Sequence, residues 1–154
     1  MDEKLVQSVR AQANTVNATS AGINLRRATR AVTQMYDRFL GPSNLQVTQF
    51  SVLVACAVAG PAPMTLLSEK LVMDRTTLAR NLKPLQTRGL VVLSSGEDRR
   101  VHVVALTDKG YSALAKALPL WQEAQTRIVK GFGQTRLSSL LQDLSALVRL
   151  AREG

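Results

Sequence analysis

The chain has 154 residues, which fits one domain or a small domain with helical extensions, and its hydrophobic content of 45% excludes a disordered chain. Its net charge of +9 favours a polyanionic partner, although charge that serves only solubility would give the same number. One cysteine, Cys56, excludes an intrachain disulfide and suits a reducing cytoplasm. No run approaches the ~20 apolar residues of a membrane span, and no signal core suggests export.

The first sixty residues predict two well-defined helices after a less certain segment. Residues 1–20 are rich in Asn, Gln, Ser and Thr, and they fit either a loose helix or a segment of low order. From Ile23 to Phe39, apolar residues recur at steps of three and four, which predicts a helix that buries one face. Gly41-Pro42-Ser43 ends it. A helix from Thr48 to Ala59 is apolar all round, so we expect it to be buried.

Two short helices are expected next. Thr65 can cap the first of them. Asp74 is placed to accept the free amide hydrogens at the start of the second helix. Pro84 removes one hydrogen bond inside the second helix, and Gly89 suits the position just past its end. The residues expected inward are Leu66, Leu67 and Leu71 in the first helix and Leu78, Leu82 and Leu85 in the second.

A β hairpin and two long helices complete the predicted order. Leu90–Leu93 is rich in β formers, Ser94–Glu97 is typical of a turn, and Val101–Leu106 is the expected return strand. Thr107 then caps a long helix. A last helix begins near Gln134, and its leucine stripe is too broad for a lone exposed helix, which predicts that another surface covers it.

The helix that begins after Asp74 carries side chains suited to reading DNA. Arginine can bridge O6 and N7 of guanine, asparagine can bridge N6 and N7 of adenine, and threonine can meet a thymine methyl or a phosphate. A lysine further along the helix can touch phosphate. A solvated helix face that happens to be basic is the alternative. The candidate residues are Arg75, Thr76, Thr77, Arg80, Asn81 and Lys83.

The turn between the two β segments adds a second basic feature. Arg99 and Arg100 stand beside Asp98, where plain turn chemistry favours Gly, Asn or Ser. An arginine in a narrow minor groove meets enhanced negative potential, and Asp98 can brace it with a charge-assisted hydrogen bond. An ordinary surface ion pair is the alternative. A capped helix followed by a hairpin with a basic tip is the order of parts in a winged helix-turn-helix.

These motifs resemble those of a known family. Asp98-x-Arg100, five residues and then Leu106-Thr107-x-x-Gly110 match the wing signature of the MarR family (multiple antibiotic resistance regulators). Residues 73–91 resemble the recognition helix of this family, in the branch with a proline in that helix. Residues 24–40 and 44–57 resemble its first two helices. The similarity covers roughly residues 22–150, although the turn SSGEDRR is shorter than the common wing of the family.

The resemblance implies a fold and an assembly. The fold would be mainly α (α+β), a single domain over residues 1–154 with a winged helix-turn-helix at residues 45–106. Residues 22–40 and 107–151 would form dimerisation helices that intertwine with those of a second copy.

The resemblance also implies roles for particular residues. Arg100 would enter the minor groove with Asp98 steadying it, the recognition-helix side chains would face the major groove, and Thr65 would meet a phosphate. A small aromatic or phenolic effector would bind between the winged and dimer parts. The candidate lining residues are Arg26, Tyr36, Phe39, Phe50 and Trp121, of which Tyr36 and Trp121 also suit core or dimer packing.

We therefore expect a cytoplasmic, homodimeric, sequence-specific transcriptional regulator, most simply a repressor, that binds a pseudo-palindromic stretch of double-stranded DNA. Two rivals are a winged-helix module for protein interaction and a sequence-indifferent architectural DNA binder. No catalytic residue, metal or cofactor is expected, because the sequence shows no Ser/His/Asp set and no phosphate loop, and His102 is its one histidine. Cys56 lies in an apolar helix, which indicates a buried thiol rather than a redox sensor.

Overall fold

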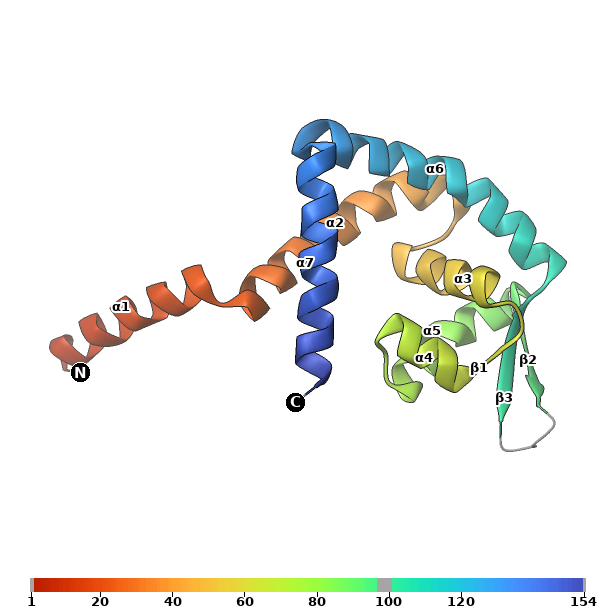
Figure 1. Ribbon diagram of the computed structural model, residues 1–154, viewed down its shortest axis with the longest axis horizontal. Coiled ribbons are helices and arrows are strands. Elements are labelled where there is room, and N and C mark those ends of the chain that lie inside the picture. The colour runs from red at the N-terminus through yellow and green to blue at the C-terminus, as the bar shows by residue number, and fades with distance from the viewer. Residues whose placement is uncertain (1, 97–100, 154) are drawn as a thin grey trace.

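The computed structural model describes residues 2–96 and 101–153 and shows a helical frame with a small antiparallel sheet at one side (Figure 1). The sheet has the order β1-β3-β2. The elements in chain order are α1 (Glu3–Thr19), α2 (Ala21–Leu40), the 3₁₀ helix η1 (Gly41–Ser43), α3 (Val47–Ala59), β1 (Ala62–Pro63), α4 (Met64–Leu71), α5 (Arg75–Thr87), β2 (Val91–Ser95), β3 (His102–Leu106), α6 (Asp108–Phe132) and α7 (Gln134–Arg152).

The main core lies where α3, α4 and α5 meet the sheet. Its largest fully buried side chains are leucines, valines and Cys56 from α3, α4, α5 and β3, together with Leu40 at the end of α2. The predicted stripe of α5 is confirmed, since Leu78, Leu82 and Leu85 are buried. This core holds α5 beside the β2–β3 hairpin, so the two expected DNA-reading parts belong to one packed unit.

Two burial predictions are wrong. The helix α3 is buried over most of its surface but not all round, because Phe50, Val52, Leu53 and Cys56 are buried while Val58 is 77% exposed. In α4, Leu66 points outward and is 39% exposed, whereas its neighbour Leu67 is fully buried. An eight-residue helix can bury only one stripe against α3 and α5, and Leu66 falls beside that stripe.

The hairpin is longer than the sequence predicted. Ser94 and Ser95 were expected in the turn, yet they pair with Val103 and His102 in the β2–β3 ladder. The backbone N–H of Gly96 then donates to the carbonyl of Val101 at 2.8 Å. The ladder therefore continues two residues further toward the tip.

The short strand β1 was missed. It lies within the Gly-Pro-Ala-Pro segment that was expected only to break the chain, and Ala62 pairs with Val104 of β3. Proline is tolerated there because β1 is an edge strand, where one face of the backbone needs no partner.

Hydrogen bonds at the helix ends stabilise the turns that follow α5 and precede α6. At the end of α5, the N–H of Leu90 donates to the carbonyl of Leu85 and that of Gly89 to Gln86, with Gly89 in the left-handed region at φ +69°. The hydroxyl of Thr107 accepts the N–H of Gly110 at 3.0 Å, as predicted. Thr65 does not cap α4, because Pro63 holds the N-cap position.

The frame outside the core consists of α1, α2, α6 and α7. The helix α6 leaves the hairpin and runs along α2, and α7 turns back from its far end (Figure 1). Leu137 of α7 is buried, but Leu140 and Leu141 are 40% and 52% exposed. The helix α1 projects from the body. Among the described residues, no helix combines the length and apolar character needed to cross a lipid bilayer.

Candidate nucleic-acid interface

The exposed face of α5 carries one polar and basic stripe. Thr76, Arg80 and Lys83 are exposed, and each precedes a buried leucine by two positions. Residues two positions apart in an α-helix are separated by roughly 200° around the helix axis, so this stripe faces away from the core. Neither a basic side chain nor a hydroxyl on this face is needed for packing, which leaves the stripe available to a partner.

The N-terminus of α5 is closed by its own cap. One carboxylate oxygen of Asp74 accepts the backbone N–H of Thr77 at 2.7 Å, and the other accepts the Thr77 hydroxyl at 2.7 Å. These bonds hold the pKa of Asp74 below its usual range. Thr77 is thus engaged within the helix by both its N–H and its hydroxyl. Arg75, next to the cap, is exposed.

Asn81 is also engaged within α5. Its side-chain nitrogen donates to the carbonyl of Thr77 at 2.9 Å and lies 4.0 Å from the sulfur of Met73. It is partly buried, unlike Arg80 on the next position. To bridge an adenine, Asn81 would have to release this bond, so the structure places it behind the exposed stripe rather than on it.

The start of α4 offers a second contact point. Thr65 is exposed in the first turn of α4, and the first amide hydrogens of this helix have no side-chain cap. Uncapped N–H groups and a nearby hydroxyl suit a phosphate oxygen. Thr65 therefore lies at the surface at the start of α4. It does not have the capping role that the sequence predicted.

The wing is described up to Gly96 and again from Val101. The paired strands extend from the body beside α5 (Figure 1). Asp98, Arg99 and Arg100 lie outside the described residues, so their predicted roles stay predictions.

Two residues that sequence reasoning did not emphasise fix the geometry of this unit. Gly110 packs so closely that an added Cβ would lie 2.0 Å from the carbonyl oxygen of Leu90. Arg88, at the end of α5, donates from Nη1 to the carbonyl of Asn44 at 2.8 Å and so ties α5 to the corner before α3. Gly110 belongs to the wing signature, which was the available signal; no local pattern marks Arg88.

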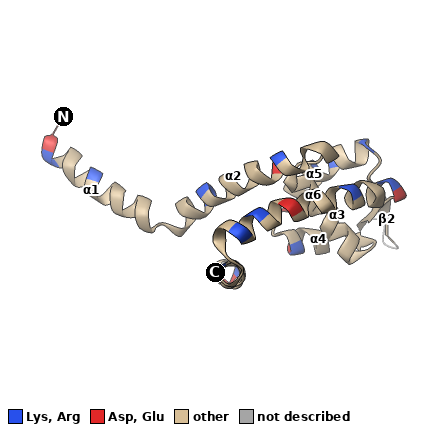
Figure 2. Ribbon diagram, turned by 90° about the horizontal axis from the view of Figure 1, so that it is seen from above, with Lys and Arg blue, Asp and Glu red and all other residues tan. Residues whose placement is uncertain are grey.

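Basic charge by itself does not mark the interface. Figure 2 shows Lys and Arg on α2 and α6 as well as on the winged part. The geometry of α5, with its buried leucines opposite its exposed cations, is what distinguishes this face.

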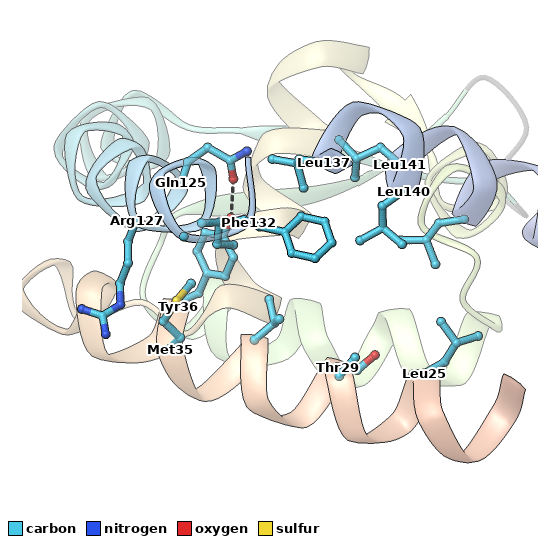
Figure 3. A pocket seen from close by; sticks show the side chains of 15 residues that line it. Leu25, Thr29, Met35, Tyr36, Gln125, Arg127, Phe132, Leu137, Leu140 and Leu141 are labelled. Atoms are coloured by element: carbon cyan, nitrogen blue, oxygen red, sulfur yellow. Dashed lines mark hydrogen bonds between the residues drawn. The ribbon is translucent and has the colours of Figure 1, made fainter. Parts of the chain in front are cut away.

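A cavity of about 660 Å³ lies between α2, α6 and α7 (Figure 3). Tyr36 lines it, and its hydroxyl bonds to Oε1 of Gln125. Burial raises the pKa of Tyr36 above its usual value. Polar groups in the lining are few. The other lining residues include Leu25, Thr29, Val32, Arg127, Ile128, Phe132, Leu137, Leu140 and Leu141.

The other predicted effector residues are not brought to this cavity. Phe50 and Trp121 stack on each other, with ring centroids 6.3 Å apart, in the core between α3 and α6. Phe39 packs against the same core, and Arg26 is exposed on α2. The aliphatic lining was not singled out from sequence, because a three-four apolar rhythm also fits ordinary core packing.

Cys56 is 1% exposed in α3. Burial raises the pKa of its thiol to about 11, so the thiolate is scarce at neutral pH.

A basic helix stripe beside a two-stranded wing defines a winged helix-turn-helix protein of the DNA-binding class. Comparison with known proteins gives the same class. A model of the MarR family matches residues 43–101. An uncharacterized HTH-type transcriptional regulator of Bacillus cereus is 31% identical over 97 residues, which are 63% of this chain and 65% of the relative. The match thus spans slightly less than two thirds of the curated relatives' length.

Two solved structures extend the comparison over most of the chain. The M. tuberculosis transcriptional regulator MosR, in complex with DNA, has a TM-score of 0.76 and 37% identity, and the match covers 86% of this chain and 98% of that chain. The transcriptional repressor CouR of Rhodococcus jostii, bound to a 23-mer DNA duplex, has a TM-score of 0.78 and 29% identity over 86% of this chain and 95% of its own. The chain belongs to the MarR family.

Proposed function

We propose that this chain is a dimeric transcriptional regulator, acting as a ligand-responsive repressor, that binds a pseudo-palindromic DNA duplex. The observation that carries the proposal is the exposed stripe of Thr76, Arg80 and Lys83, held opposite the buried leucines of α5 and beside the wing. An α-helix fits the major groove, and a hairpin next to it can reach the adjacent minor groove.

Within this proposal, base reading and phosphate binding fall to different side chains. Arg80 is exposed at the middle of the stripe and suits a guanine, while Thr76 suits a thymine methyl. Lys83, Arg75 and Thr65 surround this centre and suit phosphates. Asn81 and Thr77 contribute less to DNA binding in this proposal, because their polar atoms are hydrogen-bonded within α5.

Relatives support the assignment. MosR and CouR were each solved with bound DNA, and both exceed 25% identity with this chain. The chain's charge of +9 doubles in a dimer, which favours duplex binding through neutralised phosphates. A regulator of genomic DNA would work in the cytoplasm.

The proposed dimer follows from the frame helices. Leu140, Leu141 and Val148 of α7 are 40–52% exposed in the single chain, which is a large apolar surface for one helix to leave in water. A second copy would cover them and would place two α5 helices at half-sites about one DNA turn apart.

The cavity between α2, α6 and α7 is the proposed effector site. Its walls are mostly aliphatic, and Thr29, Tyr36, Gln125 and Arg127 are its polar lining residues. A small aromatic ring with one acidic or phenolic group fits such a lining, with Arg127 as the counter-charge. Occupation would bias the angle between α6 and α2 and so the spacing of the two α5 helices.

The stripe is tested by comparing Arg80→Ala and Lys83→Ala with the control Lys130→Ala at the far end of α6. Arg80→Ala should cost about 1–3 kcal/mol on the preferred duplex and relax discrimination at one base position per half-site. Lys83→Ala should weaken all duplexes evenly and flatten the salt dependence, and Lys130→Ala should change neither. Equal losses on every duplex from both stripe variants would show that α5 does not read bases.

The role of the wing is tested by whether removal of a negative charge weakens or strengthens DNA binding. Arg100→Ala should lower affinity at least tenfold, about 1.4 kcal/mol, in anisotropy titrations at moderate salt. Asp98→Ala should also weaken binding if Asp98 braces the arginine, since an unheld side chain loses more rotamer entropy on binding. A plain basic patch predicts the reverse, because removal of an acid tightens DNA binding. Tighter binding by the Asp98 variant would rule out bracing.

Two other functions compete with this one. A protein-interaction module would show no duplex binding that depends on Arg80 and Arg100. An architectural DNA binder would bind all duplexes alike, whereas a regulator should prefer its own site by about 10³ or more in a competitor titration.

A further inference from the structure

His102, the one histidine of the chain, begins β3 in the wing. It pairs with Ser95 in the last described pair of the β2–β3 ladder, and both residues are exposed. Neither the core nor the proposed reading of bases by α5 uses this imidazole. Its position near the tip of the hairpin raises the question of what it contacts.

The alternation of side chains along the strands shows which face of the hairpin carries His102. Side chains two residues apart in a strand point to the same face. Val104 is fully buried in the core, and Leu93, which pairs with it, packs against that core. His102 and Ser95 continue this face two residues further toward the tip, beyond the end of the core. They therefore lie on the side of the hairpin that faces α4 and α5, whereas Ser94 lies on the opposite side.

The register of β1 brings the start of α4 beside His102. Pro63 pairs with Val103 in antiparallel order, so the residues after Pro63 run along β3 toward His102. Thr65 follows two residues later, in the first turn of α4, and this helix contacts β3 (Figure 1). Thr65 is exposed. A hydroxyl and an imidazole from two different elements thus share one part of the surface.

The charges around His102 favour an external anion as its partner. The strands β1 and β2, the rest of β3 and the helix α3 contain no charged residue. Residues 97–100, two acids and two arginines, lie outside the described residues. Cations predominate on the helices that contact the sheet. Their charged residues near it are Glu69 and Lys70 in α4, Arg75, Arg80, Lys83 and Arg88 in α5, and Asp108 and Lys109 at the start of α6, with Asp74 bonded in the cap of α5.

We propose that His102, in its protonated form, binds a backbone phosphate of DNA beside Thr65, so that affinity for DNA rises as the pH falls from about 8 to about 6. A neutral imidazole offers a phosphate one N–H, whereas the protonated ring offers two and a positive charge. The inference rests on the proposed function. It adds a contact from the described strand of the wing and makes DNA binding sensitive to pH.

Anisotropy titrations at pH 6 and pH 8 test the contact. The probe is a mixed-sequence DNA duplex, because a phosphate contact does not depend on base sequence. Wild type should bind at least about fivefold more tightly at pH 6 and with a steeper salt dependence, since each phosphate contact adds about −0.9 to the slope. His102→Gln should bind equally at both pH values. His102→Lys should also bind equally at both, but more tightly than the glutamine variant, because it keeps the charge.

Two results of these titrations would overturn the inference alone. One is a wild-type protein that binds the duplex with the same Kd at pH 6 and pH 8. The other is a pH effect that His102→Gln retains, which would mean that another group titrates. A wild type that binds no duplex at either pH would overturn the proposed function and the inference together.

Histidines moved to the neighbouring strand test the face of the hairpin. In the His102→Gln chain, Ser95→His places an imidazole on the same face, and Ser94→His places one on the opposite face. All three positions are exposed, so the core is not disturbed. Ser95→His should restore a pH effect on DNA binding, and Ser94→His should not. Equal recovery from both variants, or recovery from Ser94→His alone, would overturn the proposed placement.

Discussion

Gly110 stands in the first turn of α6, where the chain passes closest to the end of α5. A Cβ at this position would lie 2.0 Å from the carbonyl oxygen of Leu90 and 2.9 Å from a methyl of Leu106. The neighbouring Thr107 hydroxyl also donates to the carbonyl of Gly89 at 2.7 Å. The last three residues of the wing signature, Leu106, Thr107 and Gly110, therefore serve to join α5, the hairpin and α6.

Gly110→Ala should lower the free energy of unfolding by about 1–3 kcal/mol, because backbone must shift to admit the methyl group. Gly22→Ala is the matched control, since nothing lies within 4 Å of a Cβ there and its backbone is helical. Urea denaturation of both variants measures the difference. Equal urea midpoints for the two variants would show that the backbone at the α5–α6 junction shifts with little loss of stability.

Cys56 offers a second residue-scale prediction. With the pKa of its thiol at about 11, roughly one molecule in a thousand carries the thiolate at pH 8. Native protein should therefore react with iodoacetamide far more slowly than urea-unfolded protein, and peroxide should not release bound DNA. Cys56→Ala should keep DNA affinity within about threefold. Peroxide release that the alanine variant abolishes would make Cys56 a redox sensor instead.

At the scale of elements, the cap of α5 gives a pH prediction. Hydrogen bonds from Thr77 hold the pKa of Asp74 below its unfolded value, so the contribution of Asp74 to stability is present above about pH 4 and is lost as pH falls through the lower, folded pKa. Asp74→Ala should lower Tm at pH 7 and remove this part of the acid dependence. Asp74→Asn keeps an acceptor for the cap without a titrating group.

Asp74→Asn should accordingly retain most of the Tm at pH 7 while losing the same acid-dependent part as the alanine variant. Thermal melts between pH 2 and pH 7 check both. An unchanged acid profile in both variants would mean that Asp74 does not stabilise α5 through its charge.

Local signals in the sequence were enough for most elements. The Asp74 cap, the left-handed Gly89 and the Thr107 cap each depend on a few neighbouring residues, and all three are confirmed. Apolar periodicity and caps placed α2, α6 and α7 within a few residues, whereas residues 1–20 fitted either a loose helix or low order and form the helix α1.

Features that depend on distant partners were the ones that sequence could not supply. The strand β1 exists only because β3 is there to pair with it, and Ser94 and Ser95 join the ladder for the same reason. Periodicity likewise does not say which side of α3 meets the core, so the exposure of Val58 was missed. For the site, the basic residues of α5 were predicted by type, but the internal bonds of Asn81 and Thr77 required coordinates.

At the scale of the whole molecule, the frame helices and the winged part have different roles. The core shared by α3, α4, α5 and the sheet fixes where the exposed stripe points, while α2, α6 and α7 carry the exposed apolar surface and the cavity. Under the proposed function, a change in the frame would move the winged part without altering its core. An effector bound in the cavity would in this way change DNA affinity.

Selection of duplexes tests the central claim most directly. Full-length protein is incubated with random-sequence duplexes at physiological salt, and the retained DNA is sequenced over several rounds. A dimer that reads DNA with α5 and the wing should enrich an inverted repeat whose half-site centres are about 10 base pairs apart, and Arg80→Ala should lose one base position in each half. Retained DNA with no enriched motif, or no retained DNA at all, would contradict the account.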